Sequence, residues 1–165
     1  MPPDFSGTWK LDHGASRFGF LPPPRLRIDT IVHQEPYIRI RTRQYDASGL
    51  TDADRNLTIG GQPIEVEIRG RSRRVRAFWL PGAERATLAA RKSLAESVLV
   101  VETTSEVSGR SRTIEDRWTL DGAGWLRIER RWSQPGGAVR QFLVLRRHGE
   151  PSALSAPLEQ TVEAR

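Results

Sequence analysis

Residues 37–46 read YIRIRTRQYD, and their side chains alternate in character along the stretch. One parity carries Ile38, Ile40, Thr42 and Gln44, and the other carries Arg39, Arg41 and Arg43. Because successive side chains of a β-strand point to opposite faces of the sheet, a period of two is typical of a strand with one buried face. Arginines at every second position require water, so we expect them outside the sheet and the isoleucines in the core.

The same alternation recurs along most of the chain and is broken at short intervals by Gly, Pro and Asp-Gly turn signals. It predicts about nine or ten strands, at the spacing of an all-β sandwich or barrel. In the preceding strand Leu26, Ile28 and Val32 take the even positions and predict its buried face. Almost every connection is of hairpin length, which favours a meander over a Greek key. We therefore predict an all-β fold, an antiparallel up-and-down β-barrel of about 8–10 strands.

Residues 83–96 depart from this pattern. They are rich in Ala, Leu, Glu, Arg and Lys and contain no Gly or Pro, which predicts one short helix, with an extra hairpin as the alternative. The segment from Gly149 onward contains Pro151 and Pro157 and is expected to be loosely docked. The expected organisation is a β-barrel domain over residues 1–148 and a flexible C-terminal tail over residues 149–165.

The length and composition fit one domain with a real core, since the chain has 165 residues. Its net charge is +6, and 24 of its 26 basic residues are arginines, the exceptions being Lys10 and Lys92. A basic balance of this kind permits acidic partners without requiring them. The chain has no cysteine, which excludes disulfides and thiolate metal ligands. His13, His33 and His148 lie far apart, so we predict no metal site and no cofactor.

No run of the sequence approaches the roughly 20 apolar residues of a membrane helix, so no membrane span is expected. The start, Met1 to Asp4, lacks the basic, apolar and small-residue order of a secretory signal. The chain as written is therefore expected to be cytoplasmic, and exported if a signal peptide has been removed from it.

The segment DFSGTWKL, residues 4–11, resembles the first strand of lipocalins and fatty-acid-binding proteins. In those families a Gly-x-Trp lies where the chain enters the barrel, and the tryptophan closes one end against an arginine of the last strand. The resemblance implies that Trp9 closes the barrel and that Arg146 or Arg147 packs against it.

The wider pattern is similar to that of small lipocalin-like proteins of soil bacteria. The shared features are SRFG at residues 16–19, three prolines at residues 22–24, a strand pair around residues 31–36 and DRWTL at residues 116–120. The likeness spans roughly residues 4–147 and implies a bacterial, lipocalin-like (calycin) barrel that binds small, lipid-like molecules. Many proteins of this group are exported.

The predicted inward faces carry the candidate ligand-binding residues. These are Thr42, Gln44, Trp79, Asp116, Trp118, Arg130, Trp132 and Phe142. Tryptophans offer a ligand stacking and apolar area, although plain core packing is the alternative for each of them.

Asp116 and Arg130 interrupt otherwise apolar inward faces on two strands that should pair. A buried charge must be paired or solvated. We expect either a mutual ion pair or a polar anchor in a cavity, unless a register error leaves one of the two outside. In fatty-acid-binding proteins, interior arginines of the late strands grip the ligand carboxylate. That resemblance implies the same role for Arg130, helped by Arg140.

No Gly-rich phosphate loop, nucleophile elbow or paired-carboxylate motif is present, so no catalytic residue is assigned. We expect a cofactor-free binding or carrier protein that holds a small hydrophobic or amphipathic molecule in the barrel. One alternative is a cofactor-free enzyme of cyclase, isomerase or hydratase type, in which Asp116 transfers a proton beside Arg130.

A third reading is a surface-interaction protein that uses arginine-rich outer strands. Its arginines would be Arg39, Arg41, Arg43, Arg69, Arg71, Arg73, Arg74 and Arg76. Nucleic acid is not the expected partner. Binding it would require aromatic side chains interleaved on the same face, and Tyr37 and Tyr45, which flank the first stripe, are weak support for it.

Overall fold

The computed structural model describes residues 2–81 and 97–149, which form ten β-strands. The strands are β1 (Gly7–Leu11), β2 (Leu26–Gln34), β3 (Tyr37–Asp46), β4 (Gly49–Thr58), β5 (Ile64–Ile68), β6 (Arg71–Trp79), β7 (Leu99–Val107), β8 (Arg110–Leu120), β9 (Leu126–Gln134) and β10 (Gly137–Arg147). This described part contains no helix, so none there could serve as a membrane span. The helix expected over residues 83–96 lies outside the described residues, as does nearly all of the tail expected over residues 149–165.

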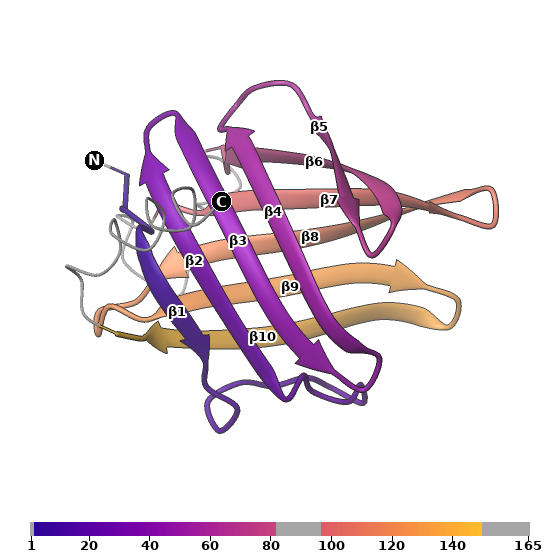
Figure 1. Ribbon diagram of the computed structural model, residues 1–165, viewed down its shortest axis with the longest axis horizontal. Coiled ribbons are helices and arrows are strands. Elements are labelled where there is room, and N and C mark those ends of the chain that lie inside the picture. The colour runs from indigo at the N-terminus through magenta and orange to yellow at the C-terminus, as the bar shows by residue number, and fades with distance from the viewer. Residues whose placement is uncertain (1, 82–96, 150–165) are drawn as a thin grey trace, which may run out of the picture.

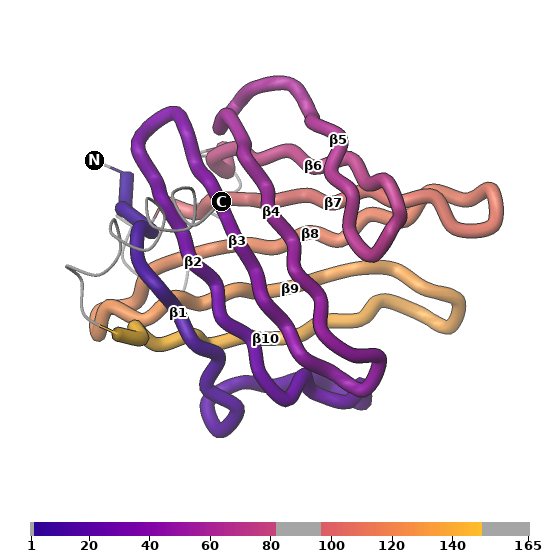
Figure 2. Tube along the Cα trace, in the orientation of Figure 1, coloured from indigo at the N-terminus to yellow at the C-terminus, as the bar shows by residue number. Residues whose placement is uncertain are grey.

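The ten strands form one antiparallel sheet in the order β4-β3-β2-β1-β10-β9-β8-β7-β6-β5. This is an up-and-down meander whose first and last strands pair with each other, with Trp9 opposite Arg147. The strands β1 to β4 cross in front of β7 to β10, so the sheet curls into a barrel (Figures 1 and 2). The predicted all-β up-and-down barrel is therefore confirmed.

The barrel is nearly closed where β4 faces β5 and β6. Near the end of β4 the backbone N–H of Gly60 donates to the carbonyl of Ala77 at 2.7 Å. Near its start the Arg69 side chain donates to Asp46 at 3.1 Å and to Ser48 at 2.8 Å. These contacts hold the two edges together in place of a β4–β5 ladder, which the described residues do not form.

One end of the barrel is closed by aromatic side chains. Phe5, Trp9 and Trp118 are fully buried there, and the Phe5 and Trp118 rings meet edge to face with centroids 5.8 Å apart. The Arg147 guanidinium lies over the Trp9 ring, 4.4 Å from its centroid. Of the two arginines expected beside Trp9, it is Arg147 and not Arg146 that makes this contact.

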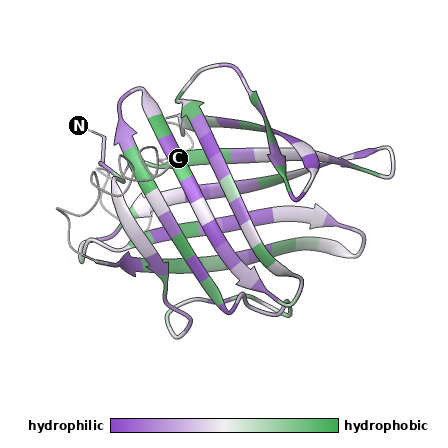
Figure 3. Ribbon diagram, viewed as in Figure 1, coloured by the Kyte–Doolittle hydropathy of each residue, from purple (hydrophilic) through white to green (hydrophobic). Residues whose placement is uncertain are grey.

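Along β3 and β4 the polarity alternates as predicted, and Figure 3 shows the alternation as green and purple bands. Ile40 is fully buried, whereas the arginines of β3 lie outside. Arg39 pairs with Asp54 at 2.7 Å, and Arg43 pairs with Asp52 at 3.0 Å. Aspartates of the neighbouring strand thus neutralise this outer face, as expected for a solvated barrel exterior.

The buried face of β2 is the odd one, which corrects the prediction made from Leu26, Ile28 and Val32. Val32 is 42% exposed, whereas Arg27 and Asp29 are 3% and 0% exposed. A pattern judged by apolar residues alone selects the wrong face here, because Arg27 and Asp29 satisfy each other's charge inside the barrel.

Phe142 does not face the interior, contrary to the prediction. Its side chain is 44% exposed, whereas its neighbours Gln141 and Leu143 are buried. The backbone of Phe142 instead anchors the β1–β2 loop by exchanging two hydrogen bonds with Arg17, at 2.7 and 2.8 Å. Residues 142–145 are apolar without a break, so they carry no period from which the inward face could be chosen.

Candidate functional site

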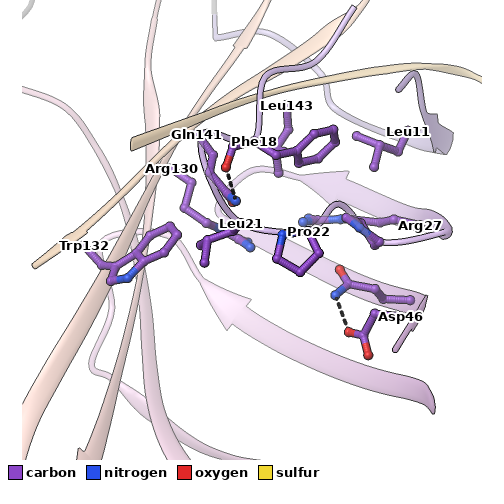
Figure 4. A pocket seen from close by; sticks show the side chains of 12 residues that line it. Leu11, Phe18, Leu21, Pro22, Arg27, Asp46, Arg130, Trp132, Gln141 and Leu143 are labelled. Atoms are coloured by element: carbon purple, nitrogen blue, oxygen red, sulfur yellow. Dashed lines mark hydrogen bonds between the residues drawn. The ribbon is translucent and has the colours of Figure 1, made fainter. Parts of the chain in front are cut away.

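A pocket of about 320 Å³ lies between the β1–β2 loop, residues 12–25, and the barrel interior (Figure 4). It is lined by Leu11, Phe18, Leu21, Pro22, Pro24, Arg27, Gln44, Asp46, Arg130, Trp132, Gln141 and Leu143. The strand β1 begins beside the aromatic end of the barrel and finishes at Leu11 in this pocket. The pocket therefore occupies the end of the barrel opposite the Phe5–Trp9–Trp118 cluster.

The β1–β2 loop is fixed over the pocket by hydrogen bonds to β10. The Phe18 carbonyl accepts from Gln141 Nε2 at 3.2 Å, and Ser16 Oγ accepts from a β10 backbone N–H at 2.9 Å. The three prolines at residues 22–24 restrict the backbone where the loop approaches β2. The apolar side chains of Phe18 and Leu21 therefore form a fixed wall of the pocket.

Two ion pairs lie inside the barrel next to the pocket. Arg27 donates to both oxygens of Asp29, from Nε at 3.3 Å and from Nη2 at 2.9 Å. Arg130 donates to both oxygens of Asp116 at 2.8 Å, so the expected ion pair is present. Each forked guanidinium occupies one carboxylate, which is the geometry that makes a buried pair tolerable.

Arg55 of β4 adds a third guanidinium to this interior group. It is 7% exposed, and its Nη2 donates to Thr42 Oγ1 at 2.9 Å. Its Nε is buried and has no hydrogen-bond partner among the described residues. Burial lowers the pKa of Arg55 to about 10, and the nearby charges of Asp29 and Arg27 act in opposite directions on it. Arg55 therefore stays charged at neutral pH.

Within this group of five side chains, three arginines face two aspartates, so the group carries one net positive charge. A further carboxylate, Asp46, lines the pocket and is paired with Arg69. The charges of the two aspartates raise the pKa of Arg55, and those of Arg27 and Arg130 lower it. An uncompensated charge in a barrel interior is unfavourable unless water or an anion accompanies it.

The surroundings of Asp116 favour its charged form. Burial would raise the pKa of Asp116, but the charge and hydrogen bonds of Arg130 outweigh it and hold that pKa below its usual range. Asp116 is not among the residues that line the pocket. In residues 2–81 and 97–149, no cluster of His, Asp and Glu side chains could hold a metal ion.

Seven of the eight predicted ligand-binding residues fall into three groups. Gln44, Arg130 and Trp132 line the pocket. Thr42 and Asp116 contact the interior arginines. The two remaining tryptophans belong to the aromatic end, where Trp118 packs in the core and Trp79 Nε1 donates to Glu35 at 3.1 Å. Phe142 lies outside, as described above.

Sequence reasoning missed Arg27, Asp29 and Arg55, together with the loop side chains that cover the pocket. The signal for the first pair was present, since an arginine and an aspartate two residues apart share one face of a strand. For Arg55 the signal was its parity with Leu57 and Ile59, which places all three on one face of the strand.

The fold and the pocket define the class of this molecule: an up-and-down, nearly closed ten-stranded β-barrel compatible with a calycin-like fold. No protein-family model matches the chain, and no curated protein matches it at a significant level.

Proposed function

We propose that the chain is a lipocalin-like binding protein that holds a small amphipathic molecule with one negatively charged group. The ligand would occupy the pocket beneath the β1–β2 loop, its apolar part against the loop and its charged group toward Arg27 and Arg130. The observation that carries this proposal is the net positive charge of the Arg27, Arg55, Arg130, Asp29 and Asp116 group, two of whose arginines line a pocket that is apolar on its loop side.

The walls of the pocket support the apolar half of the proposal. Phe18, Leu21 and Pro22 come from the loop, and Trp132 and Leu143 come from the barrel (Figure 4). A pocket of about 320 Å³ is at the lower end of the range for small-molecule sites. The expected ligand is therefore compact, and its burial would be driven by apolar area.

The arginines support the anionic half. Arg27 and Arg130 both line the pocket, and each is already engaged with an aspartate on one side. Because Arg55 adds a third positive charge to the group and the two aspartates supply only two negative charges, the electrostatic potential of the group is positive. A carboxylate in the pocket would restore neutrality and be favoured in surroundings of low dielectric constant.

A pair of probes tests the proposal: decanoate and decanol, titrated against the protein with tryptophan fluorescence as the readout. We expect decanoate to bind more tightly than decanol. The double variant Asp116→Asn, Arg130→Gln keeps the interior charge sum but removes a cationic contact. It should weaken decanoate binding by about tenfold, the effect of one charged hydrogen bond, and leave decanol nearly unchanged.

The matched control is Asp54→Asn, Arg39→Gln, which makes the same change on the outer face of the barrel. This control should leave both affinities unchanged. Equal binding of decanoate and decanol, or equal losses in the interior and outer double variants, would contradict the proposal. Thermal unfolding followed by circular dichroism establishes that each variant is folded.

A further inference from the structure

A second group of arginines lies at the rim of the barrel, on the inward face of the strands. Arg73 shares the face of the buried Val75 and Ala77 on β6, and Arg71 has the same parity. This corrects the expectation that Arg73 belongs to an outer basic surface, because Arg73 is half-buried; Arg71 is exposed, as is Arg112 of β8. On β8, Arg112 has the parity of the buried Asp116.

The register brings two of these arginines onto neighbouring positions. The β6–β7 ladder ends with Arg74 opposite Thr104. Extending this antiparallel register by one position places Arg73, which precedes Arg74, opposite Ser105, which follows Thr104. Ser105 pairs in turn with Arg112 of β8. Figure 1 shows the start of β6 beside the β7–β8 hairpin, as this register requires. Arg73 and Arg112 therefore flank Ser105 on one inward face.

This rim group has no acidic counterpart in the part of the chain that the structure describes. Arg71, Arg73 and Arg112 form no ion pair there, whereas Arg69 is paired with Asp46 and the outward Arg74 lies near Glu65. The Nε atom of Arg73 is buried and has no hydrogen-bond partner among the described residues.

The charges of the rim group act on one another. Burial lowers the pKa of Arg73, and the charges of Arg69, Arg71 and Arg112 lower it further. Like charges held together at a concave rim are unfavourable without an anion, because each guanidinium raises the potential at the others.

The rim group adjoins the pocket without being part of it. The guanidinium of Arg112 lies over the ring of Trp132, 5.6 Å from the centroid, and Trp132 lines the pocket. An anion held by Arg73 and Arg112 would therefore lie next to the pocket, beside the indole of Trp132.

We propose that Arg71, Arg73 and Arg112 form a binding site for a tetrahedral oxyanion of the phosphate class. Planar guanidinium forks match the oxygens of such an anion, and three unpaired positive charges suit a dianion better than a carboxylate. Because the three arginines share the concave inward side, the site fits a single small group rather than an extended polyanion lying along the outer surface. This site goes beyond the binding function proposed above and does not depend on it.

The test is calorimetric titration with inorganic phosphate and with pyrophosphate at constant ionic strength. We expect both anions to bind the wild-type protein. Arg73→Gln and Arg112→Gln should each weaken binding by at least about tenfold, the effect of losing one charged hydrogen bond. Arg74→Gln removes the same charge from the adjacent, outward position and should change affinity less than twofold, about the effect of a screened surface charge.

The indole N–H resonance of Trp132 provides a second readout that needs no variant. It should shift on addition of phosphate, because the anion would lie beside the ring. Absence of phosphate binding, or losses as large in Arg74→Gln as in Arg73→Gln, would overturn the proposal, since binding would then reflect only the net charge.

Dodecyl phosphate distinguishes the two sources of such an anion. Tighter binding of dodecyl phosphate than of inorganic phosphate identifies a headgroup whose chain enters the pocket, and equal binding identifies a free anion. Both results support the oxyanion site. Decanol binding should be unaffected by Arg73→Gln. Phosphate titrations therefore test the rim site, and decanol and decanoate titrations test the pocket, so that either proposal can fail without the other.

Discussion

At the scale of single residues, Arg55 is where the group of charges next to the pocket departs from balance. The Arg27–Asp29 and Arg130–Asp116 pairs each cancel internally, and Arg55 retains only the hydroxyl of Thr42 as a partner among the described residues. Under the proposed function, the charge of Arg55 helps to bind the anionic ligand and does not stabilise the ligand-free protein. The free protein should be more stable without it.

Replacing Arg55 by methionine, which has a similar length, tests this. We expect the free energy of unfolding of the ligand-free protein to rise by about 1–3 kcal/mol, because a buried unpaired charge is removed. Urea denaturation measures the change. Arg39→Met on the outer surface is the control and should change stability by less than about 0.5 kcal/mol. A loss of stability in Arg55→Met would show that the folded protein already satisfies this charge.

At the scale of elements, β1 joins the closed end of the barrel to the pocket. Gly7 begins it with a φ of +146°, and a Cβ at this position would lie 2.7 Å from Arg147 Nη1. The same atom would lie 3.3 Å from Trp9 Nε1. The glycine therefore permits the close packing of Arg147 over Trp9 that closes this end.

We expect Gly7→Ala to destabilise the protein by about 1–3 kcal/mol, through backbone strain and displacement of Arg147 from the tryptophan. Thermal unfolding gives the change in stability, and the near-ultraviolet circular dichroism of Trp9 reports the displacement. Gly14→Ala is the control, because the added Cβ would meet only Asp12 Oδ1 at an ordinary 3.5 Å. Equal stability of the two variants would mean that the contact over Trp9 contributes little.

The strands also show which parts of the fold the sequence can predict. Residues 37–46 carry a full period-two pattern, and their inward and outward faces were assigned correctly. For β2 the apolar Leu26, Ile28 and Val32 take the outward positions, and Arg27 and Asp29 lie inward with Ile31, so hydropathy alone points to the wrong face. In β10 both faces are apolar near Phe142, and only the register with β9 and the β1–β2 loop decides between them.

At the scale of the whole molecule, the barrel has two unlike ends. Aromatic side chains fill the end around Phe5 and Trp118, and the other end holds a pocket under residues 12–25. The sequence indicated the barrel because turn signals and alternation are local. It could not indicate the pocket, since the loop, β3, β9 and β10 contribute to it from distant parts of the chain. The pairing of Asp116 with Arg130 was predictable because one hairpin joins their strands.

The central claim is that the pocket binds an amphipathic anion through its interior arginines. The most direct measurement is a crystal structure of the protein grown with decanoate. The account predicts the carboxylate within hydrogen-bond distance of Arg27 or Arg130, with the chain against Trp132 and Leu143. A pocket without decanoate at saturating concentration, or decanoate bound with its carboxylate turned away from the arginines into solvent, would contradict it.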